Sequence, residues 1–250
     1  MNNVLEVNSI SKRFGGVQAL DKVSISLKAG EVLALAGDNG AGKTTLIKVI
    51  AGVYHPDRGT IKYEKNNIII DNPRYARELG IETIYQDLAL ADNLNVGANI
   101  FLGKEPMTKK FGVPIIDREY MLSESKKILK NLEIDIPEGS LEEPVGKLSG
   151  GQRQAVAIGR AIYWNAKILI MDEPTAALGH KESALFKELV GRLKSQGIGI
   201  FMISHDLHEV FELSDTVLVM SNGKLVGQSY TSQISKDELL SMIISGKKGN

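Results

Sequence analysis

Residues 31–45 read EVLALAGDNGAGKTT, and this stretch decides the fold. Its first six residues are nearly all apolar, which is typical of a buried strand. The glycines that follow let the backbone curl so that successive N–H groups point inward. Thr45–Ala51 then predicts a helix, whose N-terminus carries positive dipole charge. Gly37–Thr44 therefore fit the G-x-x-x-x-G-K-[ST] pattern of a phosphate-binding loop, in the strand–loop–helix context that the pattern requires.

This loop predicts the binding of ATP together with Mg²⁺. Lys43 can reach the β- and γ-phosphates, and the Thr44 hydroxyl can ligate Mg²⁺. The alternative is a glycine-rich turn that binds nothing, which the presence of both Lys43 and Thr44 disfavours. The residues expected to hold the nucleotide here are Gly37, Asp38, Asn39, Gly40, Ala41, Gly42, Lys43, Thr44 and Thr45.

Two acids follow a second buried strand, which is predicted at Ile168–Met171. The carboxyl end of such a strand is where α/β sheets bind ligands. Asp172 is expected to accept hydrogen bonds from Mg²⁺-bound water, and Glu173 to act as general base on an attacking water. Two acids after a strand more often form a solvated turn, but the phosphate loop in the same chain favours the catalytic interpretation.

The remaining pattern predicts an α/β core that carries an N-terminal antiparallel β subdomain and an inserted helical subdomain. We expect one domain over 1–250, with the core and β subdomain at 1–87 and 160–250 and the helical subdomain at 88–159. The β subdomain should include a hairpin at Thr60–Ile70 that turns at Asn66-Asn67. Further strands are predicted at Val4–Val7, Val23–Leu27, Ile198–Ile203 and Thr216–Met220, and helices at Ser123–Leu132, Lys181–Lys194, Asp206–Leu213 and Ser235–Ile244.

Composition excludes several classes of function. Thirty basic and thirty acidic residues cancel, so no overall field draws the chain to nucleic acid or to anionic lipid. The absence of cysteine excludes disulfides and thiolate metal sites. No apolar run approaches the ~20 residues that span a bilayer, and the N-terminus lacks a basic segment followed by an apolar one. We therefore expect any membrane association to depend on a partner.

A second glycine-rich helix start lies at Leu148–Gln152, before a helix predicted at Arg153–Ile162. Ser149 is a good N-cap, and the two glycines expose N–H groups at a positive helix end. The nucleotide-contacting residues of this segment are expected to be Ser149, Gly150, Gly151 and Gln152. If both anion sites hold one triphosphate, the simplest geometry places them on different subunits.

With this segment between the phosphate loop and Asp172-Glu173, the chain resembles the nucleotide-binding subunit of an ATP-binding-cassette transporter. The resemblance covers essentially the whole chain and implies a P-loop NTPase (RecA-like) core. It also implies that Gln86 contacts the Mg²⁺ and water region, that His205 reaches the γ-phosphate and that Phe14 stacks on adenine. Alone, Gln86 could be a surface residue and Phe14 a core aromatic, and His205 with His208 lacks a third metal ligand.

One segment departs from the family pattern. The family usually has serine-alanine-leucine-aspartate where this chain has Ala176-Ala177-Leu178-Gly179, so Gly179 cannot supply the carboxylate that crosses the dimer. The run Asp172–Gly179, together with Gly37–Thr45, resembles ATPases of bacterial monosaccharide importers of the ribose, xylose and fructose type. This resemblance implies a homodimer at the cytoplasmic face of the membrane, bound to permease subunits through a surface near 88–114 and served indirectly by an extracytoplasmic sugar-binding protein. The alternatives are an importer for a non-sugar solute, an exporter, a soluble ATPase of this family without a transport role, and a non-catalytic nucleotide-binding module.

Overall fold

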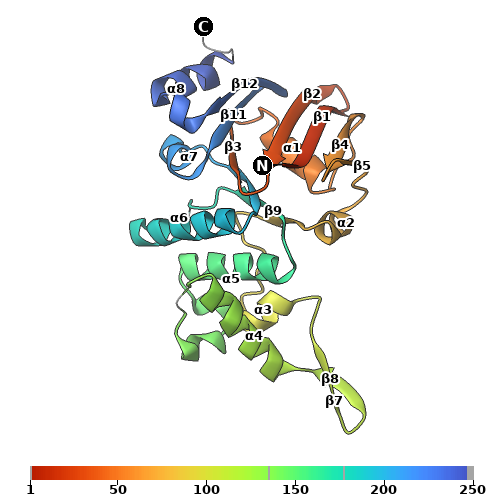
Figure 1. Ribbon diagram of the computed structural model, residues 1–250, viewed down its shortest axis with the longest axis vertical. Coiled ribbons are helices and arrows are strands. Elements are labelled where there is room, and N and C mark those ends of the chain that lie inside the picture. The colour runs from red at the N-terminus through yellow and green to blue at the C-terminus, as the bar shows by residue number, and fades with distance from the viewer. Residues whose placement is uncertain (1, 135, 177, 247–250) are drawn as a thin grey trace. The chain divides into compact units, whose positions relative to one another are not determined.

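The computed structural model describes residues 2–134, 136–176 and 178–246. It divides into two compact units, each built from separate stretches of chain (Figure 1). The first unit comprises Met1–Thr83, Lys167–Pro174 and Leu193–Asn250, and the second comprises Ile84–Ala166 and Thr175–Arg192. The second unit contains the segment 88–159 for which we expect a helical subdomain, and it also takes in part of a later helix.

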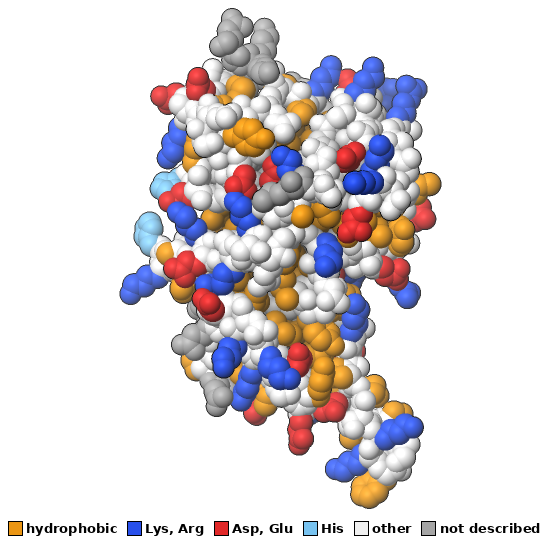
Figure 2. Space-filling model, viewed as in Figure 1, with side chains coloured by type: hydrophobic (Ala, Val, Ile, Leu, Met, Phe, Trp, Pro, Cys, Tyr) orange, Lys and Arg blue, Asp and Glu red, His pale blue; other side chains and the backbone are white. Residues whose placement is uncertain are grey.

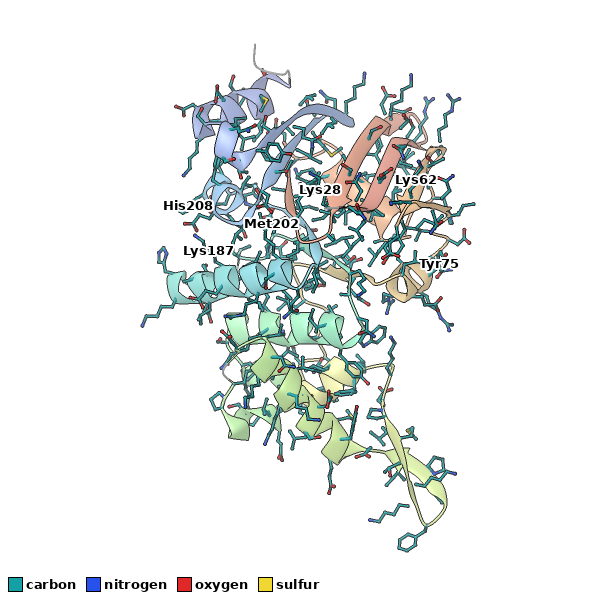
Figure 3. All side chains as sticks on the ribbon, viewed as in Figure 1. Lys28, Lys62, Tyr75, Lys187, Met202 and His208 are labelled. Carbon is teal, nitrogen blue, oxygen red and sulfur yellow. The ribbon has the colours of Figure 1, made fainter. Side chains whose placement is uncertain are left out.

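A six-stranded sheet holds the candidate nucleotide residues of the first unit in the strand order β12-β11-β3-β10-β9-β6. Strand β3 pairs in parallel with β10 and β11, β10 pairs in parallel with β9, and β12 is antiparallel to β11. Every residue of β3 and β10, including Met202 (Figure 3), is buried, which explains their continuously apolar sequences. The strands are β3 (Val32–Ala36), β6 (Ile81–Ile84), β9 (Ile168–Asp172), β10 (Gly199–Ile203), β11 (Thr216–Ser221) and β12 (Lys224–Tyr230).

A four-stranded antiparallel sheet forms the N-terminal part of the same unit, in the order β2-β1-β4-β5. Its inward side chains, such as Leu5 and Leu27, join Leu35, Leu46 and Phe201 in one apolar core. That shared core fixes the sheet against the strand and helix that flank the phosphate loop. The strands are β1 (Asn3–Phe14), β2 (Val17–Lys28), β4 (Arg58–Tyr63) and β5 (Asn66–Ile68).

The predicted turn at Asn66-Asn67 is wrong. The chain turns at Glu64-Lys65, which have φ of 45° and 71°, and Asn66 already pairs with Tyr63 in the hairpin. This register places Ile68 opposite the buried Ile61. A turn two residues later would break that apolar pair, so side-chain burial overrides the turn preference of asparagine.

Three helices of the first unit begin at side-chain caps that the sequence supplies, whereas the helix after the phosphate loop does not. Asn72, Asp206 and Ser235 each accept a hydrogen bond from a backbone N–H in the first turn of the helix that follows. These helices are α1 (Lys43–Ile50), α2 (Pro73–Glu78), α7 (Leu207–Leu213) and α8 (Lys236–Ser245), with a 3₁₀ turn at Thr231–Gln233.

The second unit is mainly helical. Helices α3, α4 and α5 pack together around buried Phe101, whose ring lies 4.3 Å from that of Tyr163 between centroids. A Cβ on Gly159 would contact Ile128 and Ile100, so this glycine permits close packing of α5. The elements are α3 (Val96–Phe101), β7 (Met107–Lys110), β8 (Val113–Ile116), α4 (Arg118–Asn131), 3₁₀ turns at Glu138–Leu141 and Val145–Lys147, α5 (Gly150–Tyr163) and α6 (His180–Ser195), whose last three residues belong to the first unit.

None of the helices in the described part of the chain combines the length and apolar character that crossing a membrane requires.

Candidate functional site

The phosphate loop connects β3 to α1 in the first unit, as the sequence predicts. Gly37 and Gly42 have φ of 143° and 103°, in the region that favours glycine. A Cβ would lie 2.2 Å from the Met220 carbonyl oxygen at Gly37 and 2.7 Å from the Ala19 carbonyl oxygen at Gly42. Both positions therefore require glycine for conformation and for space.

The N-terminus of α1 is open to an anion. Its cap, Gly42, contributes no side-chain hydrogen bond, and no acidic residue lies in the first turn. Within the described part of the chain no side-chain cap accepts from the backbone N–H groups there, so phosphate oxygens can fill that role.

The Lys43 ammonium lies on the loop itself. Its Nζ donates to the carbonyl oxygens of Gly37 at 2.5 Å and Asp38 at 3.0 Å. Burial lowers the pKa of Lys43, while the nearby carboxylates of Glu173, Asp38 and Asp172 oppose that shift. A half-buried cation held by weak neutral acceptors is suited to turn toward a phosphate.

A cavity of about 390 Å³ opens beside this loop. It brings together five parts of the first unit that are distant in sequence: the start of β2, the phosphate loop with the start of α1, the end of β9, the end of β10 with the segment after it, and the turn between β11 and β12. Its lining residues are Val17, Gln18, Ala19, Asn39, Gly40, Ala41, Gly42, Lys43, Thr44, Thr45, Asp172, Glu173, Ile203, His205 and Asn222.

Asp172 and Glu173 reach the cavity because β9 and β10 are parallel and end at the same edge of the sheet. Burial raises the pKa of Asp172, and the charges of Lys43 and Lys48 oppose the rise. Glu173 has φ of 51°, a strained backbone conformation for this residue type, and its N–H donates to the Ile203 carbonyl at 2.9 Å. The backbone thus fixes the direction of the Glu173 side chain.

His205 contacts Glu173 directly. Its Nδ1 lies 2.6 Å from Glu173 Oε1, while the Glu173 side chain is 18% exposed and that of His205 is 79% exposed. The partly buried carboxylate is therefore oriented by an exposed ring. This pair can hold a proton acceptor beside a phosphate chain.

The cavity offers oxygen donors of the kind that Mg²⁺ prefers. The Thr44 hydroxyl and the Asp172 carboxylate line the same space. The described residues contain no cluster of three or more histidine, cysteine or acidic side chains suited to a metal. This donor set fits an ion that enters with phosphate oxygens and keeps some of its water, as Mg²⁺ commonly does.

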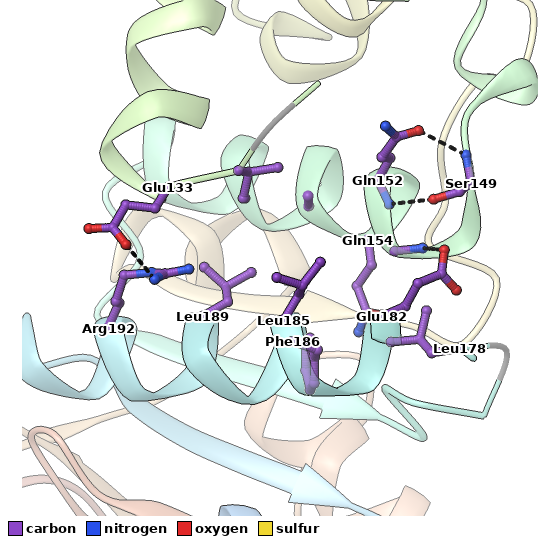
Figure 4. Close-up of a pocket in the computed structure, with 13 residues that line it drawn as sticks. Glu133, Ser149, Gln152, Gln154, Leu178, Glu182, Leu185, Phe186, Leu189 and Arg192 are labelled. Carbon is purple, nitrogen blue, oxygen red and sulfur yellow. Dashed lines mark hydrogen bonds and ion pairs between the residues drawn. The ribbon is translucent and has the colours of Figure 1, made fainter. Parts of the chain in front are cut away.

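The second glycine-rich start, in the second unit, has a capping box (Figure 4). Ser149 Oγ accepts from the Gln152 N–H at 3.3 Å, and Gln152 Oε1 accepts from the Ser149 N–H at 3.1 Å. These bonds confirm Ser149 as the N-cap of α5 and show that the helix begins at Gly150.

Glu182, from the first turn of α6, also contacts this helix start. Its Oε1 accepts from the Gly151 N–H at 3.3 Å, and its Oε2 accepts from the Gly179 N–H at 3.1 Å. Hydrogen bonds from Gly179, Ser149 and Gly151 hold the pKa of Glu182 below its usual value. A Cβ on Gly151 would lie 3.2 Å from the Glu182 side chain, which explains glycine at this position.

The family described as ABC transporter matches residues 20–176. The chain belongs to the ABC transporter family. The match spans the phosphate loop, the capped glycine-rich segment and the acid pair, and the chain is accordingly an ATP hydrolase of that family.

Curated relatives of this ABC protein carry the names of sugar importers. It is 44% identical to the xylose/arabinose import ATP-binding protein of Sulfolobus acidocaldarius, over 98% of this chain and 95% of the relative. It is 41% identical to the ribose import ATP-binding protein of Caldanaerobacter subterraneus and 40% identical to the galactofuranose transporter ATP-binding protein of Escherichia coli. These two matches cover 98% and 96% of this chain but only 48% and 47% of the relatives, so the chain spans about half of their length.

Solved structures of ABC cassettes confirm the predicted fold class. A nucleotide-free ATP-binding cassette from an ABC transporter superposes with a TM-score of 0.81 at 31% identity, over 98% of this chain and 96% of the other. A cassette in its ADP conformation also gives 0.81, at 28% identity, over 99% and 100%. The predicted α/β core, antiparallel sheet and helical part are all present.

The structure brings most of the predicted nucleotide residues of this ABC chain to one cavity. Asn39–Thr45, Asp172, Glu173 and His205 line it, while Gly37 and Asp38 lie at the start of the loop and bind Lys43. Phe14 does not line the cavity. Its ring packs edge-on against Tyr54 at 5.0 Å between centroids and is 41% exposed.

Several predicted residues lie in the other unit. Gln86 and Ser149–Gln152 belong to the second unit, where Gln86 is exposed in the loop after β6. Their roles in nucleotide contact stay predictions. Within the segment that departs from the family pattern, Ala177 lies outside the described residues, whereas Gly179 is described and contacts Glu182.

Sequence reasoning missed five lining residues, namely Val17, Gln18, Ala19, Ile203 and Asn222. Asn222 sits in the two-residue turn Asn222-Gly223 between β11 and β12, with φ of 47° and 76°. The asparagine-glycine dipeptide is a strong hairpin signal and could have located this turn. The turn is brought to the loop by the Gly223 N–H, which donates to the Ala41 carbonyl at 3.0 Å.

Proposed function

We propose that this chain is the ATPase subunit of an importer that takes up a monosaccharide, and that two copies bind and hydrolyse MgATP between them. The observation that carries this proposal is the cavity at the phosphate loop, where one cation, two carboxylates and a histidine converge. The relatives named for xylose/arabinose, ribose and galactofuranose support the monosaccharide.

ATP would bind with its phosphates on the open N-terminus of α1 and in the loop Gly37–Gly42. Lys43 would exchange the Gly37 and Asp38 carbonyls for β- and γ-phosphate oxygens, because a charged acceptor binds an ammonium more strongly than a carbonyl does. Thr44 and Asp172 would hold Mg²⁺, which when bound neutralises charge on the phosphate oxygens.

Glu173 would accept a proton from the attacking water at its carboxylate. Its fixed backbone and its contact with His205 hold the carboxylate in one direction, as a general base requires. His205 Nδ1 is engaged by Glu173, so its other ring nitrogen is the one available to the γ-phosphate.

The second copy would supply Ser149, Gly150, Gly151 and Gln152 to the γ-phosphate. Their N–H groups lie at the positive end of α5, where a phosphate would compete with the Glu182 carboxylate for the Gly151 N–H. Closure of two such copies would exclude water and strengthen these contacts. Gln86 would sense the phosphate from its exposed loop and transmit the change to permease subunits at the cytoplasmic face of the membrane, with an extracytoplasmic binding protein delivering the sugar.

Two measurements test this proposal. Purified protein should release phosphate from ATP in the presence of Mg²⁺ and lose that activity with a chelator. A strain that lacks the gene should fail to take up one of xylose, arabinose, ribose or galactose, and the wild-type gene should restore uptake while the Glu173→Gln gene should not. If the purified protein releases phosphate but the strain that lacks the gene takes up every one of these sugars, the ATPase activity stands and the proposal of monosaccharide uptake is refuted.

A further inference from the structure

The hairpin formed by β7 and β8 exposes apolar side chains to an unusual degree. All eight strand residues are exposed, and the loop residue Phe111 is 96% exposed, the largest fraction among the large apolar side chains described in the structure. Met107 and Val113 are 57% and 59% exposed. Isolated two-stranded hairpins are marginally stable in water, so this ribbon is suited to gain stability from another surface.

The loop of the hairpin has a bulky residue, Phe111, in a backbone conformation that is strained for it. Phe111 and Gly112 have φ of 53° and 81°, as in a type I′ turn. Asparagine or aspartate usually occupies the first of these positions, because a bulky side chain is strained at positive φ. Phe111 combines this strain with full exposure of its ring, and such strained residues concentrate at functional sites.

The hairpin is also basic. Its ten residues, 107–116, contain Lys109 and Lys110 and no acidic residue. Apolar and lysine side chains lie together on it in the space-filling view (Figure 2, at the place of β7–β8 in Figure 1). Aromatic rings beside lysines are the combination that binds the interface of an anionic bilayer.

The register argues against a protein groove as the partner. Met107 is opposite Ile116, and Thr108 is opposite Ile115, so Ile115 and Ile116 point to opposite faces of the ribbon. A protein groove would cover one face and leave the other apolar face in water. A lipid interface can surround both faces of an inserted ribbon.

We propose that the β7–β8 hairpin binds the surface of anionic membranes, with the Phe111 ring among the lipid headgroups and Lys109 and Lys110 beside their phosphates. This contact would place the ATPase subunit at the bilayer without permease subunits, in contrast to the expectations that membrane association depends on a partner and that permease subunits meet the surface near 88–114. The inference goes beyond the proposed function and does not depend on which solute is transported.

The test is co-sedimentation of the full chain with vesicles of phosphatidylglycerol mixed with phosphatidylcholine. We expect wild-type protein to bind these vesicles at low ionic strength and to bind pure phosphatidylcholine weakly. Phe111→Asn should reduce binding about tenfold, the worth of burying most of one aromatic side chain. Asparagine tolerates positive φ, so this variant keeps or improves the turn, and loss of binding cannot be attributed to misfolding.

Replacing Lys109 or Lys110 with glutamine should weaken binding to the anionic vesicles about fivefold per lysine, and the difference should vanish at high salt. Ile69→Asn is the matched control, because Ile69 is 74% exposed elsewhere in the chain, and it should bind as wild type does. ATP hydrolysis in solution should be unchanged in all four variants.

Three results would overturn the inference. Wild-type protein could fail to bind either vesicle, Phe111→Asn could bind as well as wild type, or neutral vesicles could bind as well as anionic ones. If vesicles do not bind but permease subunits in detergent capture wild type and not Phe111→Asn, the hairpin is a protein interface. Failure of sugar uptake in the complementation experiment would leave the vesicle result standing.

Discussion

The two glycine-rich helix starts of this chain differ in whether side chains accept hydrogen bonds from their backbone N–H groups. At α1, Gly42 provides no side-chain cap and the first turn has no acid. At α5, Ser149 and Gln152 form a capping box, and Glu182 accepts from the Gly151 N–H. The first start leaves its donors to an incoming anion, whereas the second satisfies them with side chains of its own unit.

This difference indicates a division of labour. The α1 end can bind phosphate at once, because nothing anionic has to leave. A phosphate at the α5 end has to compete with the Glu182 carboxylate, which carries the same sign of charge. The open end is thus suited to hold ATP, and the occupied end to respond only when a second copy brings a nucleotide to it.

The largest expected effect concerns the chemistry at the open end. Glu173→Gln should lower the ATP turnover number by ~10²–10⁴, the usual worth of a positioned general base, while ATP affinity is retained. Phosphate release and equilibrium binding of a fluorescent ATP analogue measure the two quantities. Turnover within a few-fold of wild type would remove Glu173 from that role.

The second largest expected effect follows from adding a side chain at Gly42, the N-cap of α1, which should weaken ATP binding. In Gly42→Ala the new Cβ meets the Ala19 carbonyl oxygen, and alanine is strained at this φ. Overpacking and positive φ each cost on the order of 1–2 kcal/mol, so ATP affinity should fall by more than tenfold. Gly191→Ala is the matched control: nothing lies within 4 Å of its Cβ in helix α6, so it should stabilise the fold by ~0.5–1 kcal/mol and leave affinity unchanged. Equal affinities in both variants would show that the loop is not the binding element.

As the pH is lowered, MgATP affinity should begin to fall at a higher pH than it would if Asp172 had the pKa of an ordinary aspartate. Burial raises the pKa of Asp172, so this carboxylate takes up its proton earlier as the pH falls, and a protonated acid cannot serve Mg²⁺. Below that pKa, affinity should fall by up to about tenfold per pH unit. Measurements of ATP affinity against pH in wild type and Asp172→Asn test this fall at low pH, which the variant should lack.

Protonation of Asp172 weakens MgATP binding, but it should stabilise the folded state without nucleotide. A carboxyl group whose pKa is higher in the folded than in the unfolded state contributes more stability at low pH, and this contribution is lost as pH rises through its folded pKa. The stability advantage of Asp172→Asn over wild type should therefore shrink as the pH falls. A pH-independent difference would contradict the raised pKa of Asp172.

The smallest expected effect concerns the occupied end. Glu182→Gln removes the negative charge beside the Gly151 N–H and should strengthen ATP-driven association of two copies about two- to fivefold, the worth of one charge at a helix terminus. Glu188→Gln, on an exposed face of the same helix, is the control. Sedimentation of both variants in a Glu173→Gln background measures association. Weaker association in Glu182→Gln would refute the idea that Glu182 competes with phosphate for the N-terminus of α5.

The sequence predicts much of this comparison because it depends on local patterns. The apolar run before Gly37, the phosphate loop and the Ser149 cap are signals carried by neighbouring residues, and each has the predicted structure. The Asp172-Glu173 pair is likewise carried to the cavity by its own strand.

What the sequence did not predict depends on contacts between distant residues. Nothing near Gly179 or Glu182 signals that Glu182 would accept from Gly151, 31 residues earlier. The direct contact of Glu173 with His205 likewise follows from neighbouring parallel strands and not from spacing. The β7–β8 hairpin was missed because apolar and lysine residues without alternation resemble no half-buried strand.

The most direct test of the account is the ATPase rate per chain measured across a wide range of protein concentration. If each nucleotide is completed by the α5 end of a second copy, the rate per chain should rise with concentration and level off as dimers form. Glu173→Gln should then sediment as a dimer with ATP and as a monomer without it. A rate per chain that is constant at every concentration, from a protein that stays monomeric, would contradict it.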